Sequence, residues 1–261
     1  MTNGNTDELV TYVVERGIAT LTLNSHHNRN ALSAALMRRL LELLGAAVAD
    51  DAVRVVVLSH EGTVFCSGAD LKETAAARRA GEVPAALLTE VLAALWECPK
   101  PTIAAVKGSA RAGGLGLIAA CDIAVCSGEA SFAFTEVRLG VIPAVISAPV
   151  LRRLSSRDAT ELYLTGRVFT GDHARQIGLV THATSWSDVD QTVADYAADI
   201  VRGAPKALAG TKTLLRRGEE DLRGELAALA TTSAGFFLSD EGREGVAAFA
   251  EKRDPSWIPD A

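Results

Sequence analysis

The first half of the chain alternates short apolar runs with amphipathic stretches, a pattern typical of an α/β protein. Residues 10–24 alternate apolar and polar side chains on both sides of Arg16-Gly17, so they predict a β-hairpin that turns at the glycine. Leucines and alanines then recur at helical spacing, which predicts a helix capped by Ser33 and ending near Asp50. A strand pair followed by a helix therefore opens the fold.

Nearly all-apolar runs come next, and such runs are typical of parallel strands that are buried on both faces. These runs are residues 53–60, 101–107 and 122–126. Helical patterns separate them at residues 84–97 and 113–120. The alternation of strand and helix implies parallel strands joined by right-handed crossovers. From Asp188 onward the pattern is helical almost to the end of the chain, at residues 188–203, 205–218 and 224–230.

Composition and charge narrow the class of protein. The 261 residues are 48% apolar and 22% charged, which is ordinary for a globular protein with one substantial core. A net charge of −6 provides no broad basic surface for a phosphate backbone, so we expect no nucleic-acid partner. The start MTNGNTDELV has no secretory signal pattern, and no apolar stretch is long enough to span a membrane. We therefore expect a cytoplasmic protein with no membrane partner.

Cysteines and arginine pairs have simple structural interpretations. Cys66, Cys98, Cys121 and Cys126 show neither a C-x-x-C spacing nor a neighbouring histidine cluster. We therefore expect reduced, mostly buried thiols and no metal site. The arginine pairs are interpreted as solvated helix faces, at positions 38/39, 78/79, 152/153 and 216/217.

Two segments could supply backbone N–H groups to a ligand. Residues 65–72, FCSGADLK, form a loop of small residues after a strand, and Lys72 adds a basic side chain. In residues 108–117, GSARAGGLGL, the glycines are expected to open a helix directly after the strand TIAAVK. The free N–H groups and the positive end of that helix would then suit an anion or an oxyanion. The simpler alternatives are an ordinary turn and close helix packing.

Glu136 is the candidate proton-transfer residue. It follows the aromatic strand FAF, and apolar surroundings would raise its pKa until the carboxyl group exchanges protons near neutral pH. The simpler alternative for Glu136 is an ion pair, formed with Arg138 or with another neighbour.

A dinucleotide-binding fingerprint is the main alternative from another class of protein. Gly114, Gly116 and Ala119 fit the pattern G-x-G-x-x-A after a strand. However, the glycines begin several residues beyond that strand, and the acidic residues about 20 positions further on lie in the wrong context. A rise in melting temperature with NADH, and none with acyl-CoA, would favour this alternative.

Taken in order, four segments resemble the crotonase (enoyl-CoA hydratase/isomerase) superfamily, and the match spans most of residues 10–180. The segments are NRNAL at 28–32, FCSGADLK at 65–72, AGGLGLIAACD at 112–122 and TEVRLGVIP at 135–143. The resemblance implies a crotonase-like spiral of β-β-α turns over residues 1–190 that carries the active site. It also implies a C-terminal helical trimerisation region over 191–261, and assembly as a homotrimer or a dimer of trimers.

The resemblance further implies an acyl-CoA thioester as substrate, with no cofactor besides the coenzyme A that the substrate carries. The N–H groups of Ala69 and Gly113 would form an oxyanion hole about 3 Å from the thioester oxygen, and Glu136 would move the proton at the α-carbon. Lys72 and Arg29, with the backbone at Asn30 and Ala31, would meet the coenzyme A phosphates and adenine. The full set of implied substrate-binding residues is Arg29, Asn30, Ala31, Ser67, Gly68, Asp70, Leu71, Lys72, Gly114 and Gly116.

One departure from the family pattern bears on the reaction. Family hydratases commonly use two glutamates, and Gly116 stands where the first is expected. We predict a hydratase or lyase in which Glu136 both positions water and returns the proton, because VIPAVIS at 141–147 resembles methylglutaconyl-CoA hydratase branches. The alternative is a Δ3,Δ2-enoyl-CoA isomerase, which needs only one carboxylate. A third possibility is a catalytically weak acyl-CoA-binding paralogue.

Overall fold

The predicted hairpin and first helix are confirmed in the computed structural model, which describes residues 8–79, 85–218 and 221–259. Strand β1 (Val10–Glu15) pairs antiparallel with β2 (Ile18–Leu23). Arg16 and Gly17 between them have φ of 51° and 82°, as a two-residue hairpin turn of this twist requires. Helix α1 (Ala34–Ala49) begins after Ser33, whose hydroxyl accepts a hydrogen bond from the Leu36 N–H at 3.2 Å.

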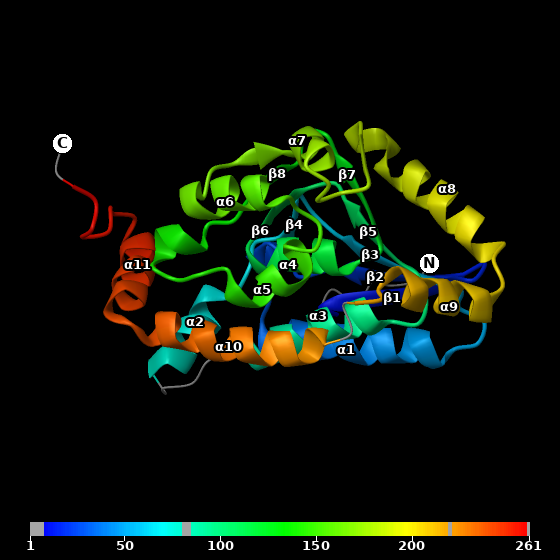
Figure 1. The fold of residues 1–261 in the computed structure, drawn as a ribbon, viewed down its shortest axis with the longest axis horizontal. Helices are drawn as coiled ribbons and strands as arrows, with labels where there is room; N and C mark the ends of the chain where they lie inside the picture. Colours follow the sequence, from blue (N-terminus) through cyan, green and yellow to red (C-terminus); the bar gives the residue numbers. More distant parts are fainter. Residues whose placement is uncertain (1–7, 80–84, 219–220, 260–261) are drawn as a thin grey trace.

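The large sheet contains the hairpin and the predicted buried strands in the order β1-β2-β3-β5-β7-β10 (Figure 1). Its other strands are β3 (Val55–His60), β5 (Thr102–Val106), β7 (Ile123–Ser127) and β10 (His182–Thr184). From β2 to β10 every neighbouring pair is parallel. The three apolar runs therefore lie in the sheet as predicted, while β10 is a strand that the pattern did not predict.

A small second sheet, in the order β4-β6-β8-β9, completes the architecture. Its strands are β4 (Val64–Cys66), β6 (Ser109–Arg111), β8 (Ser131–Ala133) and β9 (Phe169–Thr170). The chain runs through a large-sheet strand, then a small-sheet strand, then a helix, and it repeats this order three times from β3 to η2. The expected spiral of β-β-α turns is confirmed. The expectation that the glycine-rich helix directly follows TIAAVK is wrong, because β6 lies between them.

Helices account for the rest of the ordered chain. They are α2 (Leu71–Arg79), α3 (Ala85–Glu97), α4 (Gly113–Ala120), α5 (Ala144–Val150), α6 (Ser156–Thr165), α7 (Gly171–Gln176), α8 (Val189–Val201), α9 (Pro205–Leu215), α10 (Leu222–Leu238) and α11 (Asp240–Glu251). Short 3₁₀ helices are η1 (His26–Asn28), η2 (Glu136–Leu139) and η3 (Trp186–Asp188). Pro84, where one helix was predicted to begin, lies outside the described residues. Helix α10 is much longer than the predicted 224–230.

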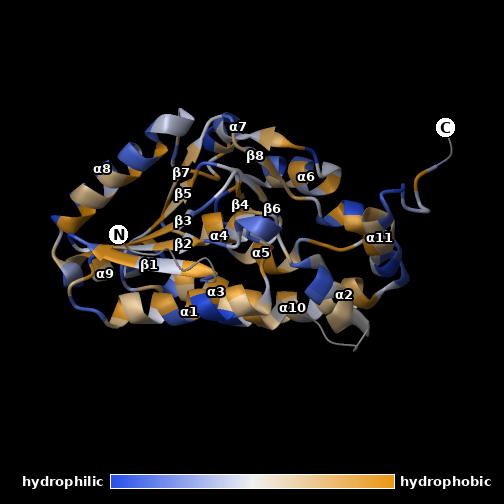
Figure 2. Ribbon diagram, turned by 180° about the vertical axis from the view of Figure 1, so that it is seen from behind, coloured by the Kyte–Doolittle hydropathy of each residue, from blue (hydrophilic) through white to orange (hydrophobic). Residues whose placement is uncertain are grey.

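The two faces of the large sheet are covered by different helices (Figure 1). Helix α8 covers one face, where its Val189, Val193 and Ala197 pack on a small cluster that includes Val55 and Val57. Helices α1, α3 and α4 pack in the main core on the other side, and α10 lies against α3 and α5. Figure 2 shows the sheet strands as mostly hydrophobic and α8 as amphipathic. Burial on both faces explains why β3, β5 and β7 read as continuous apolar runs.

The cysteine prediction is confirmed and the arginine prediction is wrong in part. All four cysteines are free and buried, and burial raises the pKa of Cys66 and of Cys121 to about 12. Arg152, Arg153 and Arg216, however, surround the ring of Trp96, with guanidinium carbons 5.7, 5.2 and 4.2 Å from its centroid. These guanidinium groups therefore lie against an aromatic ring and are only partly exposed, with 19% of the Arg152 side chain and 16% of the Arg216 side chain accessible to solvent.

In the described part of the chain, no helix is both long enough and apolar enough to cross a bilayer.

Candidate functional site

The NRNAL segment lies beside the small-residue loop that follows β4. The Ser67 N–H donates to the Arg29 carbonyl at 3.1 Å, and the Leu32 N–H donates to the Gly68 carbonyl at 2.8 Å. Leu32 and Ala69 form an isolated parallel bridge. Two segments that are far apart in sequence are thus in register, and both belong to the predicted binding site.

Asp70 fixes the start of α2, immediately after Ala69. Its Oδ1 accepts hydrogen bonds from the N–H groups of Lys72 at 2.9 Å and of Glu73 at 3.1 Å. Glu73 Oε2 in turn accepts from the Ala34 N–H at 2.7 Å, in the first turn of α1. These bonds satisfy N–H groups that helix geometry leaves unpaired at both helix starts. The Asp70 carboxylate thus orders the loop, and the Lys72 side chain is exposed.

Asn30 shapes the loop that presents Arg29. The Asn30 side chain is fully buried, and its Nδ2 donates to the carbonyls of Glu61 at 3.0 Å and Val64 at 2.8 Å. Arg29 and Asn30 both have left-handed φ, at 60° and 52°. The hydrogen bonds of Asn30 therefore hold the bend in the backbone. The side chains of Arg29 and Lys72 are both exposed to solvent. Neighbouring Ala31 is buried.

The loop that carries Ala69 touches the start of α4. Gly68 has φ of 93°, and a Cβ there would lie 3.1 Å from the Cβ of Ala112. Ala112 itself has φ of 47° and ψ of −117°, a rare and costly conformation for a residue with a side chain. Gly113 then occupies the first turn of α4, where an N–H has no acceptor within the helix. The structure therefore brings together the segments that carry Ala69 and Gly113, and a strained Ala112 directs the second.

Gly113 and Gly114 allow close packing at the start of α4. A Cβ on Gly113 would lie 2.6 Å from Leu32 Cδ1, and a Cβ on Gly114 would lie 2.8 Å from Cys66 Cβ. Both distances are too short for real carbon atoms. At Gly113 the neighbour is the end of a flexible leucine side chain, which can shift. At Gly114 the neighbours are the Cβ and carbonyl of Cys66, so α4 approaches β4 only because that position lacks a side chain. The close-packing role expected of the glycines is present, and it also draws the N-terminus of α4 toward Ala69.

Gly116, the position of the absent first glutamate, is walled in by apolar side chains. A Cβ there would lie 2.7 Å from Ile146 Cγ2 and 3.3 Å from Leu92 Cδ2. Ile146 is itself buried and comes from α5. A glutamate at this position would have to displace Ile146 and place its carboxylate among hydrocarbon groups.

Glu136 begins η2 and is buried, with only 8% of its surface exposed. Burial raises the pKa of Glu136 to about 7. Among the described residues its Oε2 atom has no hydrogen-bond partner. Arg138 donates instead to the Thr165 carbonyl at 3.1 Å, so it does not form the ion pair considered for Glu136. A buried carboxyl group that titrates near neutral pH and has an unengaged oxygen can both accept and release a proton.

Two hydroxyl groups near Glu136 were not predicted. The ring of Tyr163, on α6, lies 4.7 Å from that of Phe134, and its hydroxyl lies 3.4 Å from Ser147 Oγ on α5. Burial raises the pKa of Tyr163, and the charge of Glu136 raises it further. Tyr163 therefore stays neutral, and its hydroxyl accepts a hydrogen bond from Ser147. Its sequence position on an amphipathic helix gives no signal of this proximity.

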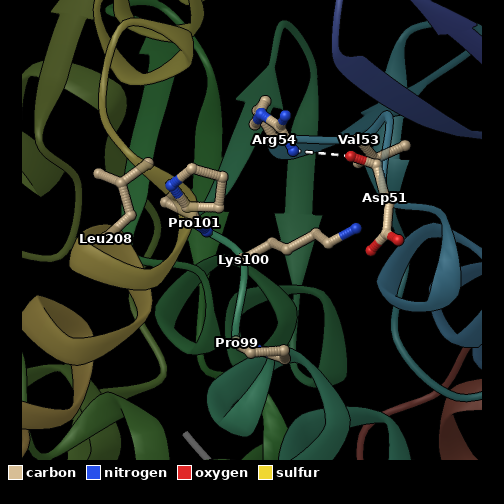
Figure 3. A pocket seen from close by; sticks show the side chains of 8 residues that line it. Asp51, Val53, Arg54, Pro99, Lys100, Pro101 and Leu208 are labelled. Atoms are coloured by element: carbon tan, nitrogen blue, oxygen red, sulfur yellow. Dashed lines mark hydrogen bonds between the residues drawn. The ribbon is translucent and has the colours of Figure 1, made fainter.

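The hollow drawn in Figure 3 is a different place. It lies where the end of α1 meets the starts of β3, β5 and α9, and is lined by Asp51, Val53, Arg54, Pro99, Lys100, Pro101, Pro205 and Leu208. Lys100 Nζ donates to the carbonyls of Ala47 and Asp50, and thereby caps the end of α1. No predicted site residue lines this hollow, so we assign it no part in the chemistry.

A buried carboxyl group, one oxygen of which has no hydrogen-bond partner among the described residues, and two loops that meet through Gly68 and Ala112 thus lie on a spiral of β-β-α turns. The chain belongs to the enoyl-CoA hydratase/isomerase family, whose model matches residues 14–259. This membership decides against the dinucleotide-binding interpretation of Gly114 and Gly116.

Relatives in the family carry names for more than one reaction. The chain is 37% identical to a "Putative enoyl-CoA hydratase" of Thermus thermophilus, over 94% of this chain and 99% of that protein. It is 33% identical to mouse methylglutaconyl-CoA hydratase (93% and 80% covered) and 32% identical to an Arabidopsis thaliana Δ(3,5)-Δ(2,4)-dienoyl-CoA isomerase (98% of each covered). A crystal structure of a Mycobacterium avium enoyl-CoA hydratase superposes with a TM-score of 0.87 at 44% identity, covering 97% of this chain and 100% of that one.

Proposed function

We propose that this enzyme hydrates an enoyl-CoA thioester, using Glu136 as its single acid–base group and the N–H groups of Ala69 and Gly113 as the oxyanion hole. The observation that carries the proposal is the state of Glu136, which is buried, pairs with no cation among the described residues and has a pKa of about 7. A carboxyl group in this state suits a reaction in which one residue both takes and returns a proton.

Proton balance closes with one carboxylate. Glu136 takes a proton from water as the water oxygen bonds to C3, and the electron pair of the C2–C3 double bond moves toward the thioester oxygen. The N–H groups of Ala69 and Gly113 stabilise the resulting enolate oxygen, because preorganised donors act most strongly where charge develops. The Glu136 carboxylic acid then gives its proton to C2. The product is a 3-hydroxyacyl-CoA, and the enzyme returns to its starting state.

The second candidate is a Δ3,Δ2-enoyl-CoA isomerase, and the surroundings of Gly116 favour it. With Ile146 and Leu92 filling that position, no second carboxylate is available there to hold a water molecule. In the isomerase reaction Glu136 removes the C2 proton of a 3-enoyl-CoA and returns it to C4, and no water is consumed. A catalytically weak acyl-CoA-binding paralogue is the third candidate.

Substrate binding and assembly follow the same proposal. The exposed cations of Arg29 and Lys72 flank the loop beside Ala69 and suit the phosphates of coenzyme A. The described residues contain no group of three or more histidine, cysteine or acidic side chains arranged for a metal ion, and the proposed reaction needs no cofactor besides the substrate's coenzyme A. Exposed Leu164, Val168 and Phe249 offer apolar surface for the proposed homotrimer or dimer of trimers.

Three separate incubations test the proposal, with crotonyl-CoA, a 3-enoyl-CoA and methylglutaconyl-CoA, followed by product mass and ultraviolet absorbance. Addition of one water to the first or the third, lost in Glu136→Gln, is the expected result. Appearance of the conjugated 2-enoyl chromophore from the 3-enoyl substrate alone, without a mass change, would make the enzyme an isomerase. No turnover of any substrate, with acyl-CoA binding that Glu136→Gln leaves unchanged, would replace catalysis by a binding role.

A further inference from the structure

The turn that carries Glu136 is in backbone contact with the last helix of the chain. Gly140 ends η2, and a Cβ on it would overlap the carbonyl of Glu241 and lie 3.0 Å from the Gly242 nitrogen, both in α11. From the other side, a Cβ on Gly245 would overlap the Leu139 carbonyl and lie 2.9 Å from the Gly140 nitrogen. The backbones of η2 and α11 therefore touch with no side chain between them, at the end of the molecule where Figure 1 labels α11.

This contact acts close to Glu136 along the chain. The N–H of Gly140 donates to the Val137 carbonyl at 3.3 Å, and the N–H of Val141 donates to the Glu136 carbonyl at 3.2 Å. Gly140, which contacts α11, and Val141, the next residue, therefore close the turn on which Glu136 lies. Both partners in this contact are backbone. If a methyl group were inserted there, no flexible side chain could move aside, and Gly140 itself would have to shift.

A second brace holds the other side of η2, and it is of a different kind. Arg138 Nη2 donates to the Thr165 carbonyl at the end of α6, at 3.1 Å. This hydrogen bond fixes the guanidinium group of Arg138, but the long, flexible side chain still allows the backbone of the turn to move. The contact with α11 is the one that fixes the backbone itself.

We infer that Gly245 is a positioning residue for Glu136: the glycine face of α11 sets the place and the dryness of the carboxyl group. The inference rests on the proposed function of Glu136, since a position matters only if the carboxylate acts. Gly242, Gly245 and Ala248 are buried at a spacing of three, so the inner face of α11 consists of small residues. Neither Gly242 nor Gly245 has the left-handed φ that would by itself demand glycine.

The charged residues around η2 do not account for the raised pKa of Glu136, so we attribute that pKa to packing. Helices α6 and α11 pack against η2, which itself carries Arg138. Their titratable groups are Arg157, Asp158, Glu161 and Tyr163 on α6, and Asp240, Glu241, Arg243, Glu244 and Glu251 on α11. Glu244 pairs with Arg253, and Glu241 is exposed. Burial is the cause that raises the pKa of Glu136. Loosening α11 should therefore move that pKa back toward the ordinary value for glutamate.

The test compares Gly245→Ala with Gly235→Ala. Gly235 lies in α10, and a Cβ there meets nothing within 4 Å, so it controls for the same substitution in a neighbouring helix. For Gly245→Ala we expect kcat to fall about 100-fold, the loss that a misplacement of about 1 Å can cause, with KM little changed. We also expect the midpoint of its kcat–pH profile to fall below the wild-type value. Gly235→Ala should match the wild type in both.

Outcomes separate this inference from the proposed function. If Gly245→Ala keeps the wild-type kcat and pH midpoint while Glu136→Gln loses turnover, the positioning role is wrong and the proposed function stands. If Glu136→Gln keeps turnover, both are wrong. Should Gly245→Ala fail to fold, Gly242→Ala displaces the same helix from the other side, because its Cβ would overlap the Phe236 carbonyl, and the same two readouts decide.

Discussion

The resemblance places two positions in the same active site, Gly116 in α4 and Glu136 in η2, and the structure surrounds them very differently. Gly116 is packed against Ile146 and Leu92, so a side chain has no room beside it. Glu136 is equally buried but keeps one carboxylate oxygen without a partner and has a pKa of about 7. The two-carboxylate arrangement common in family hydratases is thus reduced to one side of the site. Under the proposed function, the remaining carboxyl group performs both halves of the proton transfer.

The largest expected effect short of removing Glu136 itself comes from the oxyanion donor at Gly113. Gly113→Pro removes the N–H and should lower kcat about 100- to 1000-fold, the usual cost of one such donor. Proline suits the first turn of a helix, although it also restricts Ala112 before it. Steady-state kinetics with the best substrate from the three incubations would measure the loss.

Gly113→Ala is the matched control for that variant. It adds the same Cβ beside Leu32 but keeps the N–H, so it should retain most of the activity that proline abolishes. Equal losses in the two variants would mean that packing at Gly113, and not its N–H, is what catalysis needs.

The next largest effect is expected in the pH dependence of kcat, which should follow the ionisation of Glu136. The carboxylate must be ionised to accept the first proton, so kcat should fall about tenfold for each pH unit below a midpoint near 7. A kcat–pH profile measures this, with the buffer ionic strength held constant. A glutamate with the ordinary pKa of about 4.3 would be ionised throughout the range from pH 5 to 8. A kcat that is constant over this range would therefore contradict the argument that burial raises the pKa of Glu136.

The same raised pKa should appear in stability with a definite sign. The folded state keeps the Glu136 proton up to about pH 7, whereas the unfolded chain releases it near pH 4.5. The stabilisation from this group is therefore fully present below the unfolded pKa and is lost as pH rises through 7. From pH 4 to pH 8, the wild type should lose about 3 kcal/mol in unfolding free energy relative to Glu136→Gln. Urea denaturation at both pH values checks the difference, which should vanish at low pH.

The smallest effect sharpens the other side of the comparison. Gly116→Glu should lower the unfolding free energy by about 1–3 kcal/mol, because the side chain overpacks against Ile146, with a further cost for any buried charge. The double variant Gly116→Glu/Ile146→Gly should recover part of that loss. If the single variant were as stable as the wild type, the side chains of Ile146 and Leu92 would be able to move aside, which would contradict the packing described for Gly116.

The fold was predictable where one local signal decided the structure. The hairpin at Arg16-Gly17, the Ser33 cap and the all-apolar β3 each follow from a few adjacent residues, and all three are confirmed. Strands β4, β6 and β9 were not predicted, because two or three residues are too few to show a period, whereas β8 overlaps the aromatic strand FAF that was predicted before Glu136. Their pairing is set by the large sheet and the helices, which no local pattern reports. The arginines at Trp96 were misjudged for the same reason.

The site was predictable as a set of segments and not as an environment. Glu136 and the loops at Ala69 and Gly113 could be identified by their motifs, and the structure shows the two loops in contact through Gly68 and Ala112. The wall at Gly116, the strain at Ala112 and the hydroxyl of Tyr163 depend on residues brought together only by the fold. Whether each predicted residue binds or reacts stays a prediction until the variants are measured.

The most direct test of the central claim, that Glu136 alone moves the α-proton, is hydrogen exchange at C2 of butyryl-CoA. This saturated thioester cannot be hydrated or isomerised, so exchange in D₂O, followed by NMR, reports only the oxyanion site and the base. The account predicts that the wild type exchanges a C2 hydrogen and that Glu136→Gln, while still binding butyryl-CoA, exchanges it at least about 100-fold more slowly. Exchange at the wild-type rate in Glu136→Gln would show that another group moves the proton, and the account would be wrong.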